Sequence, residues 1–500
     1  TAQIAVPPSL HLDATDEDFR VYTAVGETPQ YSQTNRQTAW WRIALTGRDQ
    51  LRQRVAFALS QIFVVSDVNS TLANNPRALA NYYDILVKGA FGNARQLLED
   101  ITLSPVMGVY LSSLRNAKAT FDSTGKPLTA PDENYAREIM QLFTVGLMEL
   151  QPDGLPRLNE VGAPIPTYDN RTIAEMAKVF TGLGFYSAAP VPNFRGEPTN
   201  YLRPMMFYPA FHEDGEKAII TGRRIAARQT PEQDLKDTLD TLFNHPNAGP
   251  FLVRQLIQRL VTSNPSPGYV YRTAQVFANN GAGVRGDLGA VVRAILLDYE
   301  ARSAALAATA SYGKLKEPLL RTTAILRAFD GGANNGRFLF ANPEGNLSQA
   351  SLRAPTVFNF FEPDFVQPGT LAAAGLVAPE YQIVTDTTAI SVPNQLWNFI
   401  YAGRTGVPGT TTALNPAEGT LGVKLDNPLL ALGRNPRALV DRVNLILAAG
   451  GLPRAVTDRF VTAITAMPTS TTGTYGATDL ERVRSAIYLT VTVPQGAVQK

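Results

Sequence analysis

Hydrophobic residues recur every three or four positions through most of the chain, which is the spacing of amphipathic α-helices. Between residues 48 and 66, for example, Leu51, Val55, Leu59 and Ile62 fall on one stripe. Sustained alternation of polar and apolar residues, which is typical of a half-buried strand, is scarce. We therefore expect a mainly α, water-soluble protein: a multi-helical single globular body with long irregular loops and at most a small peripheral sheet.

The same spacing predicts helices along the rest of the chain. The expected ranges are about 76–90, 93–102, 133–148, 170–181, 231–244, 249–262, 268–279, 287–299, 315–329, 380–402, 436–449, 454–466 and 478–489. The helix at 231–244 also has a start signal, because Thr230 can cap it and Pro231 suits the first helical position.

Three segments stand outside this pattern. Residues 1–35 are expected to be an irregular N-terminal segment. The start at Thr1, with neither an initiator Met nor a signal sequence, indicates either that the chain is processed or that its beginning is not included. Residues 36–500 are expected to form one helical domain. It would carry loop insertions at 186–229 and 404–428, and loops of that length are usually functional or disordered.

Composition narrows the classes of partner. The chain has 45 Lys and Arg against 43 Asp and Glu, a formal net charge of +2, and no run of like charges. Nucleic acid is therefore not an expected partner, because binding it depends on neutralising phosphates. No stretch of 18 apolar residues predicts a transmembrane segment. Charged residues make up 18% of the chain, below the roughly 25% of typical soluble domains, which favours an exported protein.

The lack of cysteine limits the cofactors. The chain cannot form disulfides, iron–sulfur clusters or thioether-linked haem c, and it cannot bind zinc through thiolates. It also has no phosphate-binding loop, no dinucleotide fingerprint, no Gly-x-Ser-x-Gly elbow and no His-Glu-x-x-His motif. The cofactor is therefore unknown, and a divalent metal is the remaining candidate.

The segment from Asp132 to Phe143 is the first candidate for chemistry. On a helical projection Glu133, Arg137 and Glu138 share a polar face with two amides. Such a group could carry out acid–base catalysis, because Arg137 would keep one carboxylate ionised while burial raised the pKa of the other. The alternative is an exposed helix in which Glu133 and Arg137 make an ordinary i,i+4 contact. The residues alone favour this alternative.

The second candidate is the turn around His212, one of three histidines. His212 and Asp214 could bind a divalent metal, or they could act as a base and the group that orients it. The alternative is a solvated turn, which the residues favour because zinc sites need three or four ligands. His245 is expected to cap a helix end, and Trp40 and Trp41 to anchor packing.

Several motifs together resemble a bacterial family known as DUF1800, a domain of unknown function. They are the Trp40-Trp41-Arg42 triplet, the 52–60 helix, the 132–143 segment, the His212-x-Asp214-Gly215-x-Lys217 turn, His245-Pro246, the 350–361 run and Ala486-Ile487-Tyr488-Leu489. The similarity covers about residues 40–500.

The resemblance implies an exported, periplasmic or extracellular protein without a settled activity. Many relatives carry a His-Asn-His cluster where this chain has Ser60-Gln61-Ile62, so a metal site built on those histidines is not expected here. Seven residues do match the family, and this strengthens their functional interpretation. They are Glu133, Asn134, Arg137, Glu138, His212, Asp214 and Lys217.

Two hypotheses follow. The first is an exported enzyme with a polar pocket where the 133–138 helix meets the 186–229 loop. In it Glu138 or Glu133 would be the general acid or base, Arg137 would bind an anionic or carbonyl group, and His212 with Asp214 would complete the site. The second is a non-catalytic surface, matrix or scaffold protein that forms a homo-oligomer or binds an exported protein partner.

Overall fold

In the computed structural model, helices make up most of the chain. The structure describes residues 2–22, 30–189, 193–333, 336–340, 342–402, 421–469 and 477–500. The strands in this part form four separate two-stranded antiparallel pairs: β1 (Thr120–Phe121) with β2 (Pro127–Thr129), β3 (Leu183–Gly184) with β4 (Met206–Phe207), β5 (Lys217–Ala218) with β6 (Arg224–Ile225), and β7 (Lys314–Leu315) with β8 (Val498–Gln499). The mainly α prediction is confirmed.

The N-terminal helices are α1 (Ala2–Ala5), α2 (His11–Tyr22), α3 (Gln33–Thr46), α4 (Gln50–Ser60), α5 (Ser70–Ala73), α6 (Pro76–Gly89), α7 (Ala94–Thr102) and α8 (Pro105–Tyr110). The central ones are α9 (Asn134–Glu138), the π-helix η1 (Ile139–Thr144), α10 (Asn170–Val179), η2 (Pro209–Phe211), η3 (Ile220–Gly222), α11 (Pro231–Asn244), α12 (Ala248–Leu260), α13 (Pro267–Ala278), α14 (Leu288–Leu297), α15 (Tyr299–Arg302) and α16 (Ala304–Ala307). The C-terminal ones are α17 (Pro318–Ala328), α18 (Pro343–Leu347), α19 (Thr370–Ala373), η4 (Pro379–Ile383), α20 (Asp386–Trp397), the π-helix η5 (Asn398–Ala402), α21 (Asn427–Ala431), η6 (Leu432–Arg434), α22 (Pro436–Ala448), α23 (Arg454–Thr465), α24 (Ala477–Thr492) and α25 (Pro494–Ala497).

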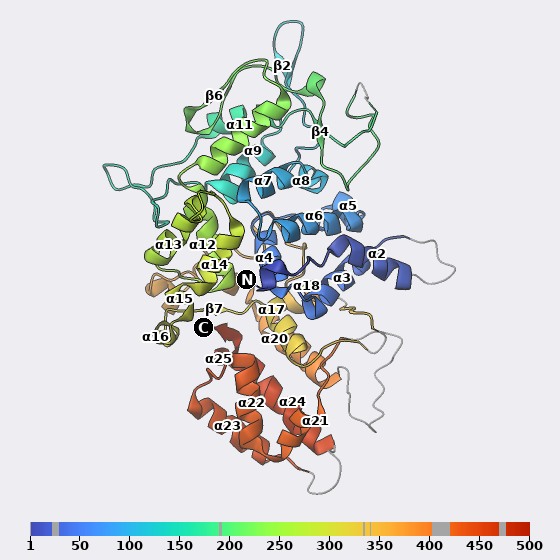
Figure 1. The fold of residues 1–500 in the computed structure, drawn as a ribbon, viewed down its shortest axis with the longest axis vertical. Helices are drawn as coiled ribbons and strands as arrows, with labels where there is room; N and C mark the ends of the chain where they lie inside the picture. Colours follow the sequence, from blue (N-terminus) through green and yellow to red (C-terminus); the bar gives the residue numbers. More distant parts are fainter. Residues whose placement is uncertain are drawn as a thin grey trace.

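These helices form an elongated body with both termini near its middle (Figure 1). Helices α9 and α11 lie towards one end of the body and α21 to α24 at the other, while α4, α6, α12 and α17 lie between them. One large cluster of buried apolar side chains extends along the chain from Trp40 to Val491, and Ala14, Ala39 and Ile43 form a second, small one. Within the described ranges no helix combines the length and the apolar character needed to cross a membrane.

Residues 11–22, inside the segment expected to be irregular, form α2, which packs against α3 and α6. The Asp84 carboxylate on α6 accepts hydrogen bonds from the His11 and Leu12 backbone N–H groups at 2.6 and 3.1 Å, and so satisfies the start of α2. The hydrophobic pattern missed this helix because much of its buried face is polar. The buried positions are His11, Ala14, Thr15 and Asp18.

The mid-chain helix also differs from the prediction. Its α-helical part ends at Glu138, and the chain continues as η1, a π-helix. The wider turn is stabilised by the Thr144 hydroxyl, which donates to the Ile139 carbonyl at 2.6 Å. At Gly146 the chain turns with φ +73°, and a Cβ there would lie 2.8 Å from the Phe251 ring. Glycine therefore lets the π-turn approach α12 closely.

The two expected loop insertions have different outcomes. The 186–229 segment carries β4, η2, β5, η3 and β6 within its described residues, so it is partly ordered into short elements. Of the 404–428 segment, residues 404–420 lie outside the described residues. Its remaining part leads into α21, and Gly422 there forms a bridge with Gly332.

Candidate functional site

Glu133 and Arg137 lie on the surface of α9. Their nearest charged atoms are 3.4 Å apart, and the two side chains are 44% and 41% exposed. An exposed i,i+4 pair of this kind stabilises a helix by only about 0.3–0.5 kcal/mol. Glu133 and Arg137 therefore make the ordinary surface contact that was the alternative interpretation of this helix.

Glu138 points away from this pair into the protein. It is 6% exposed, and its Oε2 atom has no hydrogen-bond partner among the described residues. Burial raises the pKa of the Glu138 carboxyl, and Arg137 only partly opposes this. Five residues on an α-helix correspond to a rotation of about 140° beyond one full turn, which explains why Glu138 and Glu133 face different environments.

His212 is buried, and its neighbours differ from those expected. Its Nδ1 donates to the Thr181 carbonyl at 2.8 Å, and its Nε2 lies 3.1 Å from Oδ2 of Asp234 on α11. Lys217 Nζ lies 2.6 Å from the same carboxylate oxygen. The carboxylate that His212 contacts is thus Asp234, whereas Asp214 is exposed. The turn is held by an almost completely buried ionic network.

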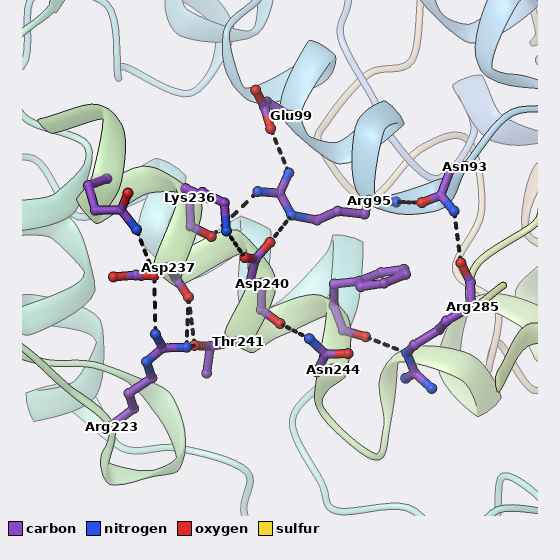
Figure 2. A network of polar contacts seen from close by, with 12 residues as sticks. Asn93, Arg95, Glu99, Arg223, Lys236, Asp237, Asp240, Thr241, Asn244 and Arg285 are labelled. Carbon is purple, nitrogen blue, oxygen red and sulfur yellow. Dashed lines mark hydrogen bonds and ion pairs between the residues drawn. The ribbon is translucent and has the colours of Figure 1, made fainter. Parts of the chain in front are cut away.

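Helix α11, which carries Asp234, is fastened to α7 by a second network on another face (Figure 2). Arg95 Nε lies 2.7 Å from Asp240 Oδ1, and Lys236 Nζ lies 2.7 Å from the other oxygen of Asp240. Arg95 also pairs with Glu99 at 2.7 Å. These contacts fix the position of α11 and therefore help to hold the buried network around His212.

Metal binding at His212 and Asp214 receives no geometric support. In the part of the chain that the structure describes, no group of three or more histidine, aspartate or glutamate side chains is arranged to hold a metal ion. His245 lies directly after α11, where its Nδ1 accepts a hydrogen bond from the Asn247 backbone N–H at 3.1 Å. Trp41 is buried against Phe340, as expected of a packing anchor.

A cavity of about 520 Å³, which we call the amide cavity, opens beside η1. Its volume is within the range of about 300–1,000 Å³ that is typical of small-molecule sites. None of the five residues predicted for the catalytic site lines it. Its wall comes from four separate segments: Gln61 and Ile62; Gln141, Leu142, Val145 to Met148, Leu150 and Gly154; Phe251, Arg254, Gln255, Gln258 and Arg259; Val357, Phe358 and Glu362 to Asp364.

The floor of the amide cavity contains two glutamines whose orientation is fixed. Gln61 Nε2 donates to Glu317 Oε2 at 2.5 Å, and Gln258 Nε2 donates to the Ser263 and Pro363 carbonyls at 3.0 and 2.8 Å. Because these bonds fix each amide nitrogen, Oε1 is the free end of both side chains. Neither oxygen has a partner among the described residues.

Two unpartnered donors accompany these acceptors. Gln255 Nε2 and Arg259 Nε are buried and have no acceptor within the described part of the chain. The other nitrogens of the Arg259 guanidinium donate to the Gln255 and Gln61 carbonyls at 3.2 and 3.0 Å. Burial lowers the pKa of Arg259 to about 10. Residues that line the cavity thus carry two buried acceptors and two buried donors without partners among the described residues.

Beneath the floor lies a set of buried charges that we call the central ion cluster, made of Arg259, Lys314, Glu317 and Glu380. Lys314 Nζ lies 2.8 Å from Glu380 Oε1, 3.6 Å from Glu317 Oε1 and 3.1 Å from the Arg259 carbonyl oxygen. Glu317 Oε2 also accepts a hydrogen bond from Gln349 at 2.6 Å. The Glu317 and Glu380 carboxylates also act on the Arg259 guanidinium from beyond ion-pair distance, and the Gln61 amide connects this cluster to the cavity.

The sides of the amide cavity are mainly apolar, with a charged rim. Phe251 and Phe358 contribute aromatic surface, and Phe358 is 44% exposed. Arg254 lines the same cavity, and burial lowers the pKa of its guanidinium while the Asp364 carboxylate partly opposes this. Glu362 and Asp364 are exposed. The site thus combines amides, the guanidinium groups of Arg254 and Arg259, and two carboxylates with apolar walls.

Comparison with known proteins gives one match. A family model described as a protein of unknown function (DUF1800) matches residues 2–495. No curated protein and no solved structure matches the chain.

Proposed function

Because the chain belongs to the DUF1800 family, which has no assigned function, we propose from the site itself that the amide cavity binds an uncharged, polyhydroxylated molecule of the saccharide class. One observation carries this proposal. Four buried polar atoms, two acceptors and two donors, have no partner in the described part of the chain and belong to residues that line one cavity: Gln61 Oε1, Gln258 Oε1, Gln255 Nε2 and Arg259 Nε.

A hydroxyl group suits this set because it can both donate and accept a hydrogen bond. A buried polar group without a partner costs about 1–3 kcal/mol, so a ligand that pairs with these atoms recovers part of that cost. Neighbouring atoms cover all four in this structure, so the proposal requires that their side chains move when the ligand binds. A negatively charged ligand would meet two carbonyl-type oxygens, and a positively charged one would meet Arg254 and Arg259.

The walls support the same class of ligand. Phe251 and Phe358 offer flat apolar surface for the C–H faces of a sugar ring. At the rim, Arg254, Glu362 and Asp364 can make charge-assisted hydrogen bonds to hydroxyl groups. A few convergent polar groups within a mainly apolar wall are the usual composition of a small-molecule site.

The proposal is tested by titrating a panel of mono-, di- and oligosaccharides into the full chain by calorimetry. The informative variant is Gln255→Met. The amide nitrogen of Gln255 has no partner in the described part of the chain. Replacing the Gln255 side chain with an apolar one of similar length therefore costs little stability. We expect the dissociation constant for the bound saccharide to rise at least about tenfold, which corresponds to about 1.4 kcal/mol. The melting temperature should stay close to that of the wild type.

Arg254→Met is a second test variant, and Arg285→Met is its matched control. Both arginines are half-buried and have no ion-pair partner among the described residues, but only Arg254 lines the cavity. Arg254→Met should weaken saccharide binding and Arg285→Met should not. The proposal fails if no member of the panel binds saturably, or if Gln255→Met binds as tightly as the wild type.

We also propose that the protein acts outside the cytoplasm. The low proportion of charged residues, 18% of the chain, supports this location. Fractionation of the organism that makes the protein, with antibody detection beside a cytoplasmic marker enzyme, tests the proposal. Recovery of the protein with the cytoplasmic marker would contradict it.

A further inference from the structure

A second cavity of about 700 Å³, which we call the basic cavity, lies on another side of α4. Gln61, which directly follows α4, lines the amide cavity, whereas Arg54 within α4 lines the basic cavity. Lys316 and Arg327 line the basic cavity as well, together with His11. The central ion cluster contributes to both walls, through Arg259 in one and through Lys314 and Glu317 in the other.

Three cations of the basic cavity are bound only to neutral groups. Arg54 Nη2 donates to the Arg259 carbonyl at 3.2 Å, while its Nη1 atom is buried and has no partner among the described residues. Lys316 Nζ donates to the Gly496 carbonyl at 3.0 Å. Arg327 Nη1 donates to the Leu45 carbonyl at 2.8 Å. In the described ranges, no carboxylate lies within ion-pair distance of any of the three.

The carboxylate of Glu317, which lines this cavity, is already engaged by other groups of the protein. Glu317 accepts hydrogen bonds from Gln61 and Gln349 on one oxygen, and its other oxygen faces Lys314. Lys314 itself is paired with Glu380 at 2.8 Å. The remaining charge of the wall, from Arg54, Lys316 and Arg327, is therefore positive; Glu317 and Glu380, beyond ion-pair distance, only partly oppose the effect of burial on Arg54.

Positive charge in a partly dehydrated cavity is costly unless an anion is paired with it. Burial lowers the pKa of Arg54 and of Lys316, which has the same physical origin as this cost. An anion in the cavity would offset the cost, and guanidinium groups suit carboxylate and phosphate oxygens through paired N–H donors. His11 adds no positive charge at neutral pH, because burial lowers its pKa to about 4.

We propose that the basic cavity is a binding site for a small anion bearing carboxylate or phosphate groups, with Arg54 as its main donor and Lys316 and Arg327 as supporting cations. This site is separate from the proposed saccharide site. The two use different side chains and ligands of different charge, so the failure of one proposal leaves the other standing.

The test uses the full chain at pH 7 with sodium phosphate and sodium citrate as probes, added at constant ionic strength against sodium chloride. His11 supplies a local signal, because the chain has only three histidines and the imidazole Cε1–H resonance of His11 is assigned by its loss in His11→Gln. We expect a saturable shift of this resonance with at least one probe, together with a rise in melting temperature.

Arg54→Met should weaken the response to the probe at least about tenfold. Arg52→Met is the matched control on the same helix. Arg52 is half-buried, donates to the Val87 and Ile4 carbonyls, and has an unpartnered Nε atom among the described residues, but it does not line the cavity. This variant should respond like the wild type. Arg327→Met, at an exposed position, replaces Arg54→Met if the latter does not fold.

A response to phosphate alone identifies a phosphorylated ligand, and a response to citrate alone identifies a carboxylate ligand. Either outcome supports the site. The proposal is overturned if the His11 resonance shifts equally in every salt at equal ionic strength. Equal weakening in Arg54→Met and Arg52→Met, or none in Arg54→Met, also overturns it.

Discussion

Replacing His11 should remove a pH-dependent part of the stability. The His11 ring is buried, and its Nε2 lies 2.9 Å from Oε1 of Gln53. Gln53 Nε2 donates to the Ser9 carbonyl and to Asp49 Oδ2, so Oε1 is the atom that faces the ring. The Nε2 of His11 therefore carries the proton, and the neutral ring satisfies this contact. Burial lowers the pKa of His11 from 6.5 to about 4.

The size of the effect follows from this shift. The pKa of His11 is lower by about 2.5 in the folded protein than in the unfolded one, which corresponds to about 3 kcal/mol of unfolding free energy. Between pH 6.5 and pH 4 the unfolded chain binds a proton at His11 that the folded protein does not bind. The contribution to the free energy of unfolding is therefore complete above pH 6.5, and it is lost as the pH falls towards 4.

Denaturant unfolding of the wild type and of His11→Gln, at intervals from pH 7 to pH 4, measures this contribution. The other titrating groups contribute nearly equally to both proteins, so the difference between the two free energies isolates His11. That difference should change by about 3 kcal/mol across the range, in the direction that favours the variant at low pH. A change below about 1 kcal/mol, or an imidazole resonance that titrates near pH 6.5 in the folded protein, would refute this account of His11.

Four further substitutions test the surroundings of His212, Arg137 and Glu138, each through the melting temperature and denaturant unfolding. Asp234→Asn should destabilise by about 3–5 kcal/mol because it leaves Lys217 buried without its carboxylate, whereas Asp214→Asn should stay within about 0.5 kcal/mol; equal effects would mean that His212 is not held by Asp234. Arg137→Ala should change stability by less than about 0.5 kcal/mol, and a loss of several kcal/mol would show that Arg137 has a buried partner. Glu138→Gln should raise the melting temperature at pH 7, since the raised pKa of Glu138 reflects a cost of keeping its carboxylate ionised. This gain should disappear as the pH falls through the raised pKa, and a gain that persists unchanged at low pH would contradict the explanation.

The helices could be predicted from the sequence because most of them bury an apolar stripe. The signals at helix starts were also informative: the Thr230 hydroxyl accepts a hydrogen bond from the Gln233 N–H, and Pro231 occupies the first turn of α11. Helix α2 lacks such a stripe, because buried polar residues such as His11 and Asp18 face its neighbours. The π-helix was not predicted either, since spacing of three and four does not distinguish an α-turn from the start of a π-turn.

The candidate site could be predicted only where its parts are local. The Glu133–Arg137 contact follows from four-residue spacing on a helix. The contact of His212 with Asp234 joins a turn to a helix 22 residues further on, and nothing in the sequence favours it over the adjacent Asp214. The amide cavity brings together segments from residue 61 to residue 364, and uncharged glutamines leave no motif. What could have drawn attention to them is the pair of amides, Gln255 and Gln258, three residues apart on a predicted helix.

Because of the central ion cluster, the two cavities need to be tested by substitutions outside that cluster. Lys314, Glu317 and Glu380 are buried and paired, so removing one of these charges leaves a partner without compensation and costs about 3–5 kcal/mol. Because Glu317 holds the Gln61 amide and also lines the basic cavity, its replacement would disturb both cavities at once. Gln255 and Arg54 each reach a single cavity, and each ends in an atom without a partner among the described residues. Substitutions at these two positions therefore distinguish one cavity from the other.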